Sequence, residues 1–345
     1  MPAGTLLIRA DASARMGAGH VMRCLALSQA WQSLGGRSAF LSDGMPAALT
    51  QRLESEGVAV AQMRSKPGTA EDGAETAAFA RSLGAKWVVA DGYHLSGELH
   101  RIIKQDGLSL LHIDDVGQGA YYAADVILNQ NAHAHESLYG TRQEYTRLLL
   151  GPRYAMLRRE FLLVSHECAN PATARKVLVT LGGGDADNVT LKVVRALGLL
   201  QAGRIEARVL LGPASPHAEV LNREMSRAGC PAVLLRSVEG MPEQMAWADL
   251  AISAGGSTCW ELAFLGVPCI LIVLAQNQRP IAESLAERGS VINLGWHDRV
   301  SVDTLAGRID ELLLNAGLRA QMRRSGMEMV DGLGARRVAL FLCNG

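Results

Sequence analysis

The chain has 345 residues, of which 48% are hydrophobic, only 5% are aromatic and 36 are glycine. This length suits two domains of ordinary size. Because many glycines and few aromatics suit turns between strands and helices, the composition favours an α/β fold over an all-β sandwich. The 34 basic and 34 acidic residues balance, so the chain lacks the basic field that non-specific nucleic-acid binding requires.

The N-terminal segment has no basic stretch followed by an apolar one, so no signal peptide is expected. The longest apolar run, residues 267–275, is shorter than the roughly 20 residues that cross a bilayer. The six cysteines are scattered and none forms a C-x-x-C pair, which argues against a zinc knuckle or a redox motif. We therefore expect a cytoplasmic protein with no membrane or nucleic-acid partner.

The first half of the chain alternates apolar, β-branched runs with helical patterns, which is typical of a parallel sheet. The predicted strands are residues 5–10, 37–41, 86–90, 109–113 and 125–128. Several of them end in polar or acidic residues, namely Asp11, Asp91, Asp114, Asp115 and Asn129. Because ligands bind outside the carboxyl ends of the strands in an open parallel sheet, we expect a site at these residues.

The second half repeats the same alternation. Its predicted strands are residues 176–181, 205–211, 232–235, 249–253 and 268–274, and the pattern from 302 to 342 is mostly helical. Residues 151–167 are charged and contain Pro152, so they form the predicted linker. We therefore expect two domains, residues 1–155 and residues 156–345, the second ending in the helical tail.

Gly17 and Gly19 stand at the turn between the first strand and the following helix, and His20 lies in the first turn of that helix. Glycines at such a turn let a ligand approach the backbone, where free N–H groups can face an anion. A lone histidine is more often structural, but at this place an imidazole can act as a general base or bind a phosphate. The helix N-terminus would disfavour its protonated form, which suits a base.

Three successive glycines, Gly182, Gly183 and Gly184, follow the strand predicted at 176–181. Asp185 and Asn188 come next, and such residues near a helix start are ordinary caps. Since three glycines exceed what a cap needs, the pattern favours a ligand-binding loop.

A third loop, Gly255-Gly256-Ser257-Thr258, follows the strand predicted at 249–253. Its glycines and hydroxyls can offer hydrogen-bond donors to a diphosphate. Glu261 lies one turn further on, where its carboxylate can accept hydrogen bonds from a ribose diol. The alternative, a capping serine followed by a solvated glutamate, stays open.

The run Gly255-Gly-Ser-Thr-x-x-Glu261, followed by Gly266-Val-Pro268 and Asn277-Gln278, resembles the UDP-sugar site of the GT-B superfamily. The closest analogue there is the N-acetylglucosaminyl transferase of peptidoglycan lipid intermediates. The resemblance implies that the loop binds the diphosphate, that Glu261 binds the ribose, and that the later polar pair faces the sugar. The residues concerned are Gly255, Gly256, Ser257, Thr258, Glu261, Asn277 and Gln278.

Six blocks of the first half stand in a consistent order: Arg9-Ala-Asp11-Ala-Ser13, Gly17-Ala-Gly-His20-Val-Met-Arg23, Asp91-Gly-Tyr93, Asp114-Asp115, Leu128-Asn129-Gln-Asn131-Ala132 and Gly151-x-x-Tyr154-Ala-x-x-Arg158-Arg-Glu160-Phe161. Together they resemble the UDP-sugar hydrolase family of the pseudaminic acid pathway. That family removes UDP from UDP-2,4-diacetamido-2,4,6-trideoxy-β-L-altropyranose. The chain departs from the family's pattern in its longer tail beyond about Leu294 and in His94, where the family tends to have a small residue.

The resemblance implies a GT-B-like α/β fold of two Rossmann-like domains whose parallel sheets face each other across a cleft. UDP would bind mainly to the second domain, and the sugar would reach toward the first. Water would attack the anomeric carbon with inversion, with His20 as the base or water-orienting residue and no metal or cofactor required. The further substrate-binding residues expected are Arg9, Asp11, Gly17, Gly19, Arg23, Asp91, Tyr93, Asn129, Gly183 and Gly184.

Other functions fit parts of the pattern. A glycosyltransferase or a hydrolase of a related surface-polysaccharide UDP-sugar would share the donor site, although no segment suited to docking on a lipid acceptor is evident. A dinucleotide oxidoreductase is opposed by Met22, which replaces the third glycine of G-x-G-x-x-G. A non-catalytic nucleotide-sugar sensor would keep Glu261 but have no use for His20. A zinc hydrolase would need ligands from His94, His112, His133, His135, Asp114 and Asp115.

Overall fold

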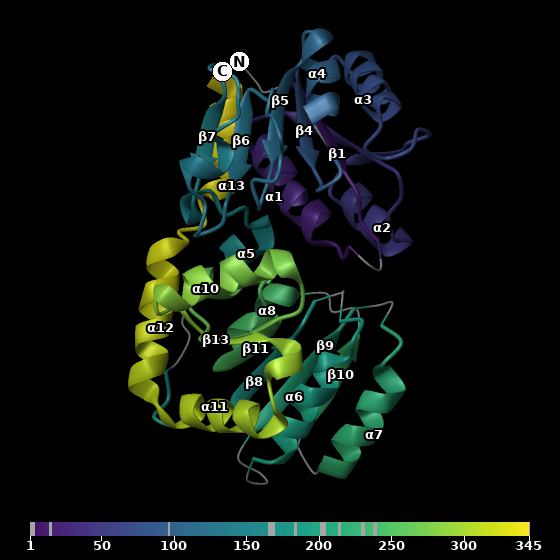
Figure 1. Cartoon of the computed structure of the whole chain (residues 1–345). Coiled ribbons are helices and arrows are strands. Elements are labelled where there is room, and N and C mark those ends of the chain that lie inside the picture. The colour runs from purple at the N-terminus through teal and green to yellow at the C-terminus, as the bar shows by residue number, and fades with distance from the viewer. Residues whose placement is uncertain are drawn as a thin grey trace. The chain divides into compact units, whose positions relative to one another are not determined.

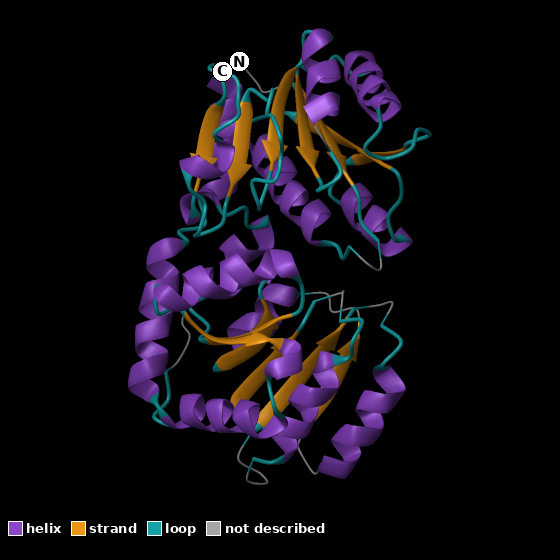
Figure 2. Ribbon diagram, in the orientation of Figure 1, coloured by secondary structure: helices purple, strands orange, loops and turns teal. Residues whose placement is uncertain are grey.

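The computed structural model describes residues 4–13, 16–95, 97–164, 170–182, 185–200, 205–212, 215–228, 232–236 and 240–344. The chain divides into two compact units, one comprising Met1–Arg159 with Gly332–Gly345 and the other Glu160–Asp331. Each unit contains one open parallel sheet flanked by helices (Figures 1 and 2). This confirms the predicted α/β class with two parallel sheets.

The first unit is built on seven strands in the order β3-β2-β1-β4-β5-β6-β7, and every pairing in this sheet is parallel. The strands are β1 (Thr5–Ala10), β2 (Arg37–Ser42), β3 (Ala59–Gln62), β4 (Trp87–Asp91), β5 (Ser109–Ile113), β6 (Val126–Asn129) and β7 (Arg147–Leu150). The central strands are buried on both faces, as Leu6, Leu7 and Ile8 of β1 show by having no exposed surface. Such strands are continuous apolar runs, which made them recognisable in the sequence.

Two sets of helices cover the opposite faces of this sheet. The helices are α1 (Gly19–Ser33), α2 (Ala47–Ser55), α3 (Ala70–Ser82), α4 (Gly97–Gln105) and α13 (Gly334–Asn344). Leu6 and Ile8 belong to the core formed with α1, α2 and α13, whereas Leu7 belongs to the core formed with α3 and α4. This division follows from the alternation of side chains along a strand.

The second unit has six strands in the order β10-β9-β8-β11-β12-β13, again with parallel pairings throughout. The strands are β8 (Lys176–Thr180), β9 (Glu206–Leu211), β10 (Ala232–Arg236), β11 (Leu250–Ala254), β12 (Cys269–Val273) and β13 (Val291–Trp296). The helices are α6 (Val189–Gly198), α7 (Ala218–Ala228), α8 (Met241–Trp247), α9 (Thr258–Phe264), α10 (Arg279–Glu287), α11 (Val302–Leu314) and α12 (Ala316–Met329).

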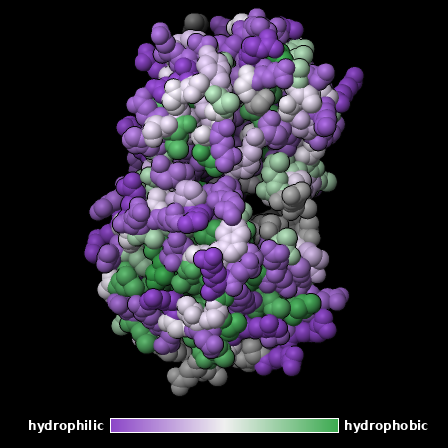
Figure 3. Space-filling model, in the orientation of Figure 1, coloured by the Kyte–Doolittle hydropathy of each residue, from purple (hydrophilic) through white to green (hydrophobic). Residues whose placement is uncertain are grey.

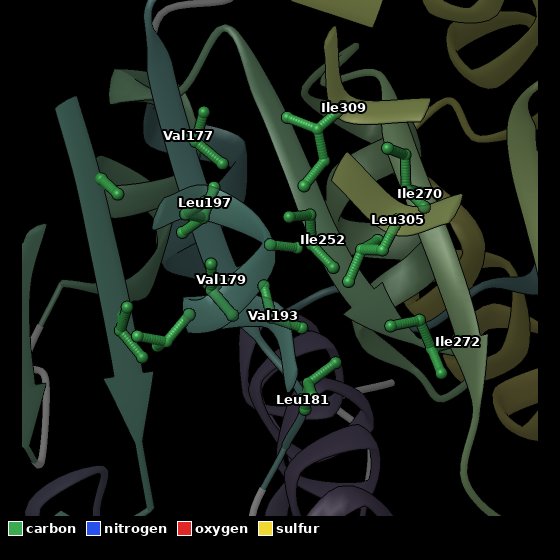
Figure 4. Packing of buried hydrophobic residues seen from close by; sticks show 14 of the residues in the cluster. Val177, Val179, Leu181, Val193, Leu197, Ile252, Ile270, Ile272, Leu305 and Ile309 are labelled. Atoms are coloured by element: carbon green, nitrogen blue, oxygen red, sulfur yellow. The ribbon is translucent and has the colours of Figure 1, made fainter. Parts of the chain in front are cut away.

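The core of the second unit lies between its sheet and the helices α6 and α11. Figure 4 shows Val179 and Ile252 from the sheet directed toward Val193 of α6 and toward Leu305 and Ile309 of α11. All five side chains have no exposed surface. Burying an aliphatic side chain of this size contributes about 1.5–3 kcal/mol, so this core fixes the position of β8 and β11 and of the loops that follow them.

The chain leaves the first unit at α5 (Arg159–Leu163), inside the segment predicted as a linker, and returns to it at Gly332. The sequence assigned the whole tail to the second domain, but the structure places α13 with the first. Val338 and Leu342 of α13 are buried in the core that contains α1. Gly334 permits this packing because a Cβ atom there would lie 2.1 Å from the carbonyl oxygen of Ala155.

Hydrophilic residues are interspersed with smaller hydrophobic areas on the face of the molecule drawn in Figure 3. Among the residues that the structure describes, no helix is both long and apolar enough to span a membrane.

Candidate active site

Polar side chains gather at the carboxyl ends of four neighbouring strands of the first unit. The sheet order places β1, β4, β5 and β6 side by side, so their carboxyl ends share one edge of the sheet. The residues at or just beyond these ends are Asp11, Asp91, Asp114, Asp115, Asn129 and Asn131. Helix α1 starts at the same edge and brings His20 and Arg23 to them through hydrogen bonds with Asp91.

His20 and Asp91 form a buried imidazole–carboxylate pair. The Nδ1 atom of His20 lies 2.7 Å from Oδ1 of Asp91, and the two residues are 8% and 1% exposed. Burial alone would raise the pKa of Asp91, but the charge of Arg23 and the hydrogen bonds from Arg23 and His20 outweigh it and lower that pKa below its ordinary value. An ionised carboxylate can only accept a hydrogen bond, so Nδ1 carries the hydrogen. In the neutral ring Nε2 is then the atom that can take a proton.

Arg23 fixes this pair in place. Its Nε and Nη2 atoms each donate to an oxygen of Asp91 at 2.7 Å, while its Nη1 atom donates to both oxygens of Asp115 at 2.8 Å. Asp115 also accepts from Nδ2 of Asn131 at 2.7 Å. The side chain of Arg23 is only 6% exposed, and in this structure it positions Asp91 and Asp115.

Tyr93 covers the outer side of this arrangement. Its ring meets that of His20 edge-on, with centroids 5.1 Å apart, and its hydroxyl lies 3.5 Å from Oδ2 of Asp115. Tyr93 is 51% exposed, so its side chain remains accessible to a ligand that approaches His20. Gly17 adopts a φ of +80°, and among the described residues no atom lies within 4 Å of where its Cβ would be.

Arg9 does not occupy the position that the sequence suggested for it. It has no exposed surface, and its guanidinium donates to both oxygens of Asp72 at 3.0 Å and to Oδ1 of Asp11 at 2.6 Å. A buried arginine needs such partners because an unpaired charge in the interior is costly. In this structure Arg9 therefore holds Asp11 from behind, and its contact with a substrate stays a prediction.

Asn129 and Asp91 are buried and hydrogen-bonded in the same way as Arg9. Asn129 is fully buried, with Nδ2 donating to the hydroxyl of Tyr139 at 2.8 Å and Oδ1 accepting from Asn131. Both oxygens of Asp91 are occupied by His20 and Arg23 and it too is inaccessible. These residues support the site from within, and a direct contact with a substrate stays a prediction.

Three supporting residues, Cys24, Asp72 and Asn131, were not among those predicted from the sequence, and Asp115 was expected at the site only as a polar strand end. Asp115 and Asn131 stood in the motifs of the first half, so their position after predicted strands was an available signal. Asp72 lies in the first turn of α3, where an acidic residue is an ordinary feature of a helix start. Asp72 could have been predicted only by first recognising that Arg9 is buried and therefore requires a carboxylate partner.

In the second unit, Gly182 has a φ of +79°, whereas Gly183 and Gly184 lie outside the described residues. Asp185 accepts hydrogen bonds from the backbone N–H groups of Val189 and Thr190 at 2.6 and 2.9 Å. Asp185 therefore caps α6, which is the simpler of the two interpretations that the sequence allowed.

The loop between β11 and α9 packs against a second loop that carries two predicted residues. A Cβ atom on Gly255 would lie 2.9 Å from the carbonyl oxygen of Gln278, so Gly255 and Gln278 are in close contact. Gln278 in turn accepts a hydrogen bond from the backbone N–H of Leu274 at 2.9 Å. The hydroxyl of Ser257 does not cap α9, and Ser257 and Thr258 are both partly exposed. The hydroxyls at this turn therefore remain accessible to a ligand.

We predict that Gly255→Ala destabilises the protein by about 1–3 kcal/mol, the usual cost of forcing an extra carbon into a packed site. The added methyl group would press on the backbone of Gln278, which cannot rotate away. Gly256→Ala is the matched control, since no atom of the described residues lies within 4 Å of the position of its Cβ. Urea unfolding measures both variants, and equal losses of stability would contradict this account of the loop.

The histidines considered for a zinc site are dispersed. The ring of His112 packs against that of His100 with centroids 4.6 Å apart, His133 contacts the carbonyl oxygen of Asp115, and His135 lies beside Ser137. Within the described parts of the chain, no group of three or more His, Cys, Asp or Glu side chains is placed to hold a metal ion.

Known proteins share this architecture. A sequence model described as the glycosyltransferase family 28 C-terminal domain matches residues 176–333. MurG from Acinetobacter baumannii is 16% identical and superposes over 99% of both chains with a TM-score of 0.68. Anabaena Alr3699/HepE, solved in complex with UDP and glucose, is 13% identical and superposes over 99% of this chain and 100% of that chain, with a TM-score of 0.64. The two-sheet α/β architecture is thus that of the GT-B glycosyltransferases.

A curated relative adds a sequence match. The spore coat polysaccharide biosynthesis protein SpsG of Bacillus subtilis strain 168 is 29% identical over 201 residues, which are 58% of this chain and 59% of the relative. The chain spans less than two thirds of the length of the curated relatives that it matches.

Proposed function

We propose that this chain is a hydrolase that releases UDP from a UDP-sugar, and that His20 is its general base. The observation that carries the proposal is the His20–Asp91 pair, with Nδ1 held 2.7 Å from a buried carboxylate and Nε2 left to take a proton. A base of this kind contributes about 10²–10⁴-fold to a rate. The resemblance of the first-half motifs to the pseudaminic acid pathway hydrolases supports UDP-2,4-diacetamido-2,4,6-trideoxy-β-L-altropyranose as the substrate.

In the proposed reaction a water molecule forms a bond from its oxygen to the anomeric carbon of the sugar. Its proton moves to Nε2 of His20, and the anomeric C–O bond breaks with its electron pair leaving on UDP. Asp91 stabilises the imidazolium that results, as an ionised partner of Nδ1 does. Attack from the face opposite the leaving group inverts the anomeric carbon.

The UDP end of the substrate is proposed to bind at Gly255 to Glu261. The family model that matches this part of the chain describes a glycosyltransferase domain, and HepE, which has the same fold, was solved with UDP and glucose. The partly exposed Ser257 and Thr258 can donate hydrogen bonds to a diphosphate. Donors directed at the leaving group stabilise the charge that develops on it.

We predict that Glu261→Ala weakens UDP binding by about 1.5–3 kcal/mol, the usual contribution of hydrogen bonds that involve a charged group. The carboxylate would no longer accept hydrogen bonds from the two ribose hydroxyls. Isothermal calorimetry with UDP measures the change, and Glu283→Ala, on the exposed side of α10, serves as the control. An affinity for UDP that is the same in both variants would argue against a nucleotide site at this loop.

A glycosyltransferase that uses a UDP-amino sugar donor is the second candidate. The match to a glycosyltransferase domain and the likeness to MurG favour it, because a donor site does not distinguish water from another acceptor. The buried Asp91 and His20 would then activate an acceptor hydroxyl by the same proton transfer.

One experiment separates the two candidates. The purified protein is incubated in ¹⁸O-labelled water with a panel of UDP-sugars and no acceptor. A hydrolase releases UDP and free sugar with ¹⁸O at the anomeric carbon. Release of UDP only after an acceptor is added would favour the transferase, and no turnover of any UDP-sugar under either condition would count against both.

A further inference from the structure

A pocket of about 470 Å³ opens in the first unit, next to the candidate active site. Its wall includes Asp11 after β1, Asp43 after β2, and His94 after β4, together with the apolar Met45 and Pro67. His94 is the direct neighbour of Tyr93, whose ring contacts His20. The pocket therefore adjoins the residue proposed as the base, without being part of the hydrogen-bond network around it.

His94 is held at the pocket wall by close backbone packing. A Cβ atom on Gly68 would lie 2.7 Å from the carbonyl oxygen of His94, and one on Gly92 would lie 2.9 Å from the imidazole. Nε2 of His94 lies 3.0 Å from Oδ2 of Asp11, yet it makes no aligned hydrogen bond with any described residue. The contact with Asp11 is therefore poorly aligned, and a ligand atom could provide this buried nitrogen with a better hydrogen bond.

Asp11 presents one oxygen to the pocket and uses the other internally. Oδ1 accepts from Arg9, from the hydroxyl of Ser42 and from the backbone N–H of Asp43. Among the described residues, the ion pair given for Oδ2 is that with His94. Burial would raise the pKa of Asp11, but the contacts with His94 and Arg9 outweigh it and lower that pKa, so the carboxylate is ionised at neutral pH.

The lining of the pocket selects a class of ligand. Its described residues include two carboxylates and neither lysine nor arginine, so they would repel an acidic group. An amide matches it better, because its N–H can donate to Oδ2 of Asp11 and its carbonyl oxygen can accept from His94. The methyl group of an acetyl would then meet the apolar side chains of Met45 and Pro67.

We propose that this pocket is the subsite for an N-acylamino substituent of the sugar and that His94 determines that specificity. The proposal rests on the proposed function, since it assumes that a UDP-sugar is the ligand. It goes further in naming the substituent that the first unit recognises and the pair, His94 and Asp11, that recognises it.

Calorimetry with two matched ligand pairs tests the proposal: UDP-N-acetylglucosamine against UDP-glucose, and UDP-N-acetylgalactosamine against UDP-galactose. The intact protein should bind the acetamido member of at least one pair about tenfold more tightly than its hydroxyl counterpart, which corresponds to about 1.4 kcal/mol. In His94→Ala this preference should fall below about twofold while the affinity for UDP alone stays unchanged. His135→Ala, an equivalent change at an exposed histidine, should keep the preference.

Met45→Trp provides a second variant, which fills the pocket while His94 and Asp11 themselves are not mutated, and it too should abolish the preference. Should the intact protein bind UDP but show no preference in either pair, or should His94→Ala retain the tenfold preference, the pocket proposal is overturned while the proposed function stands. A protein that does not bind UDP at all would instead overturn the proposed function, and this proposal with it.

Discussion

His20→Asn is expected to lower turnover of the UDP-sugar by about 10²–10⁴-fold, with UDP affinity close to that of the unmodified protein. An asparagine amide can still donate a hydrogen bond toward Asp91, as Nδ1 does over 2.7 Å, so the buried carboxylate keeps a partner. The amide cannot take a proton at neutral pH, and so the step assigned to Nε2 is lost. Steady-state kinetics and calorimetry with UDP measure the two quantities separately.

The alternative role for His20 is structural, and the same variant distinguishes it. A structural histidine would leave the activity of each folded molecule intact and lower the melting temperature instead. His135→Asn is the control, since this histidine lies on the surface and contacts only Ser137 among the interactions of the described chain. Turnover by His20→Asn at nearly the normal rate would show that His20 is not the base.

The sequence predicted the two sheets well because most strands are buried on both faces. The strands it missed, β3, β7 and β13, all lie at sheet edges. The residues of β3 are all at least partly exposed, and none of β13 is fully buried. An edge strand faces less of the core, so it carries a weaker apolar pattern, and its pairing becomes evident only in three dimensions.

The site was predictable in part for a comparable reason. Polar residues after buried strands, such as Asp11 and Asp91, mark the edge where ligands bind in parallel sheets. The sequence cannot tell which of them face a ligand and which hold their neighbours. Arg9 and Asp72 are 63 residues apart in the chain but share two hydrogen bonds, a pairing that depends on how α3 packs on the sheet.

Asp91→Asn is expected to destabilise the protein by about 3–5 kcal/mol, the usual cost of breaking a buried ion pair by removing one charge. Each oxygen of Asp91 accepts a hydrogen bond from Arg23, one from Nε and one from Nη2, both at 2.7 Å. Whichever oxygen becomes an NH₂ group therefore places a donor against a donor. Turnover should also fall, because His20 loses the partner that holds its hydrogen on Nδ1.

Asp106→Asn is the matched control for this experiment. Asp106 pairs with Arg81 at the surface, where side chains are 34% and 53% exposed, and such pairs contribute only about 0–1 kcal/mol. Urea unfolding at neutral pH should therefore separate the two variants clearly. A similar small loss in both would mean that the buried network around Arg23 does not stabilise the fold.

The stabilisation by Asp91 should also depend on pH in a defined direction. The pKa of this carboxyl is lowered in the folded protein, where Arg23 and His20 outweigh the effect of burial. In the unfolded chain an aspartate has a pKa of about 3.9. The ionised form therefore stabilises the fold fully above that value, and the stabilisation is lost as the pH falls toward the folded pKa.

The measurement is the difference in unfolding free energy between the unmodified protein and Asp91→Asn. This difference should be constant between about pH 6 and about pH 8 and should shrink below about pH 4. A difference that stays the same down to pH 3 would show that the ionisation of Asp91 is not what stabilises this edge of the sheet.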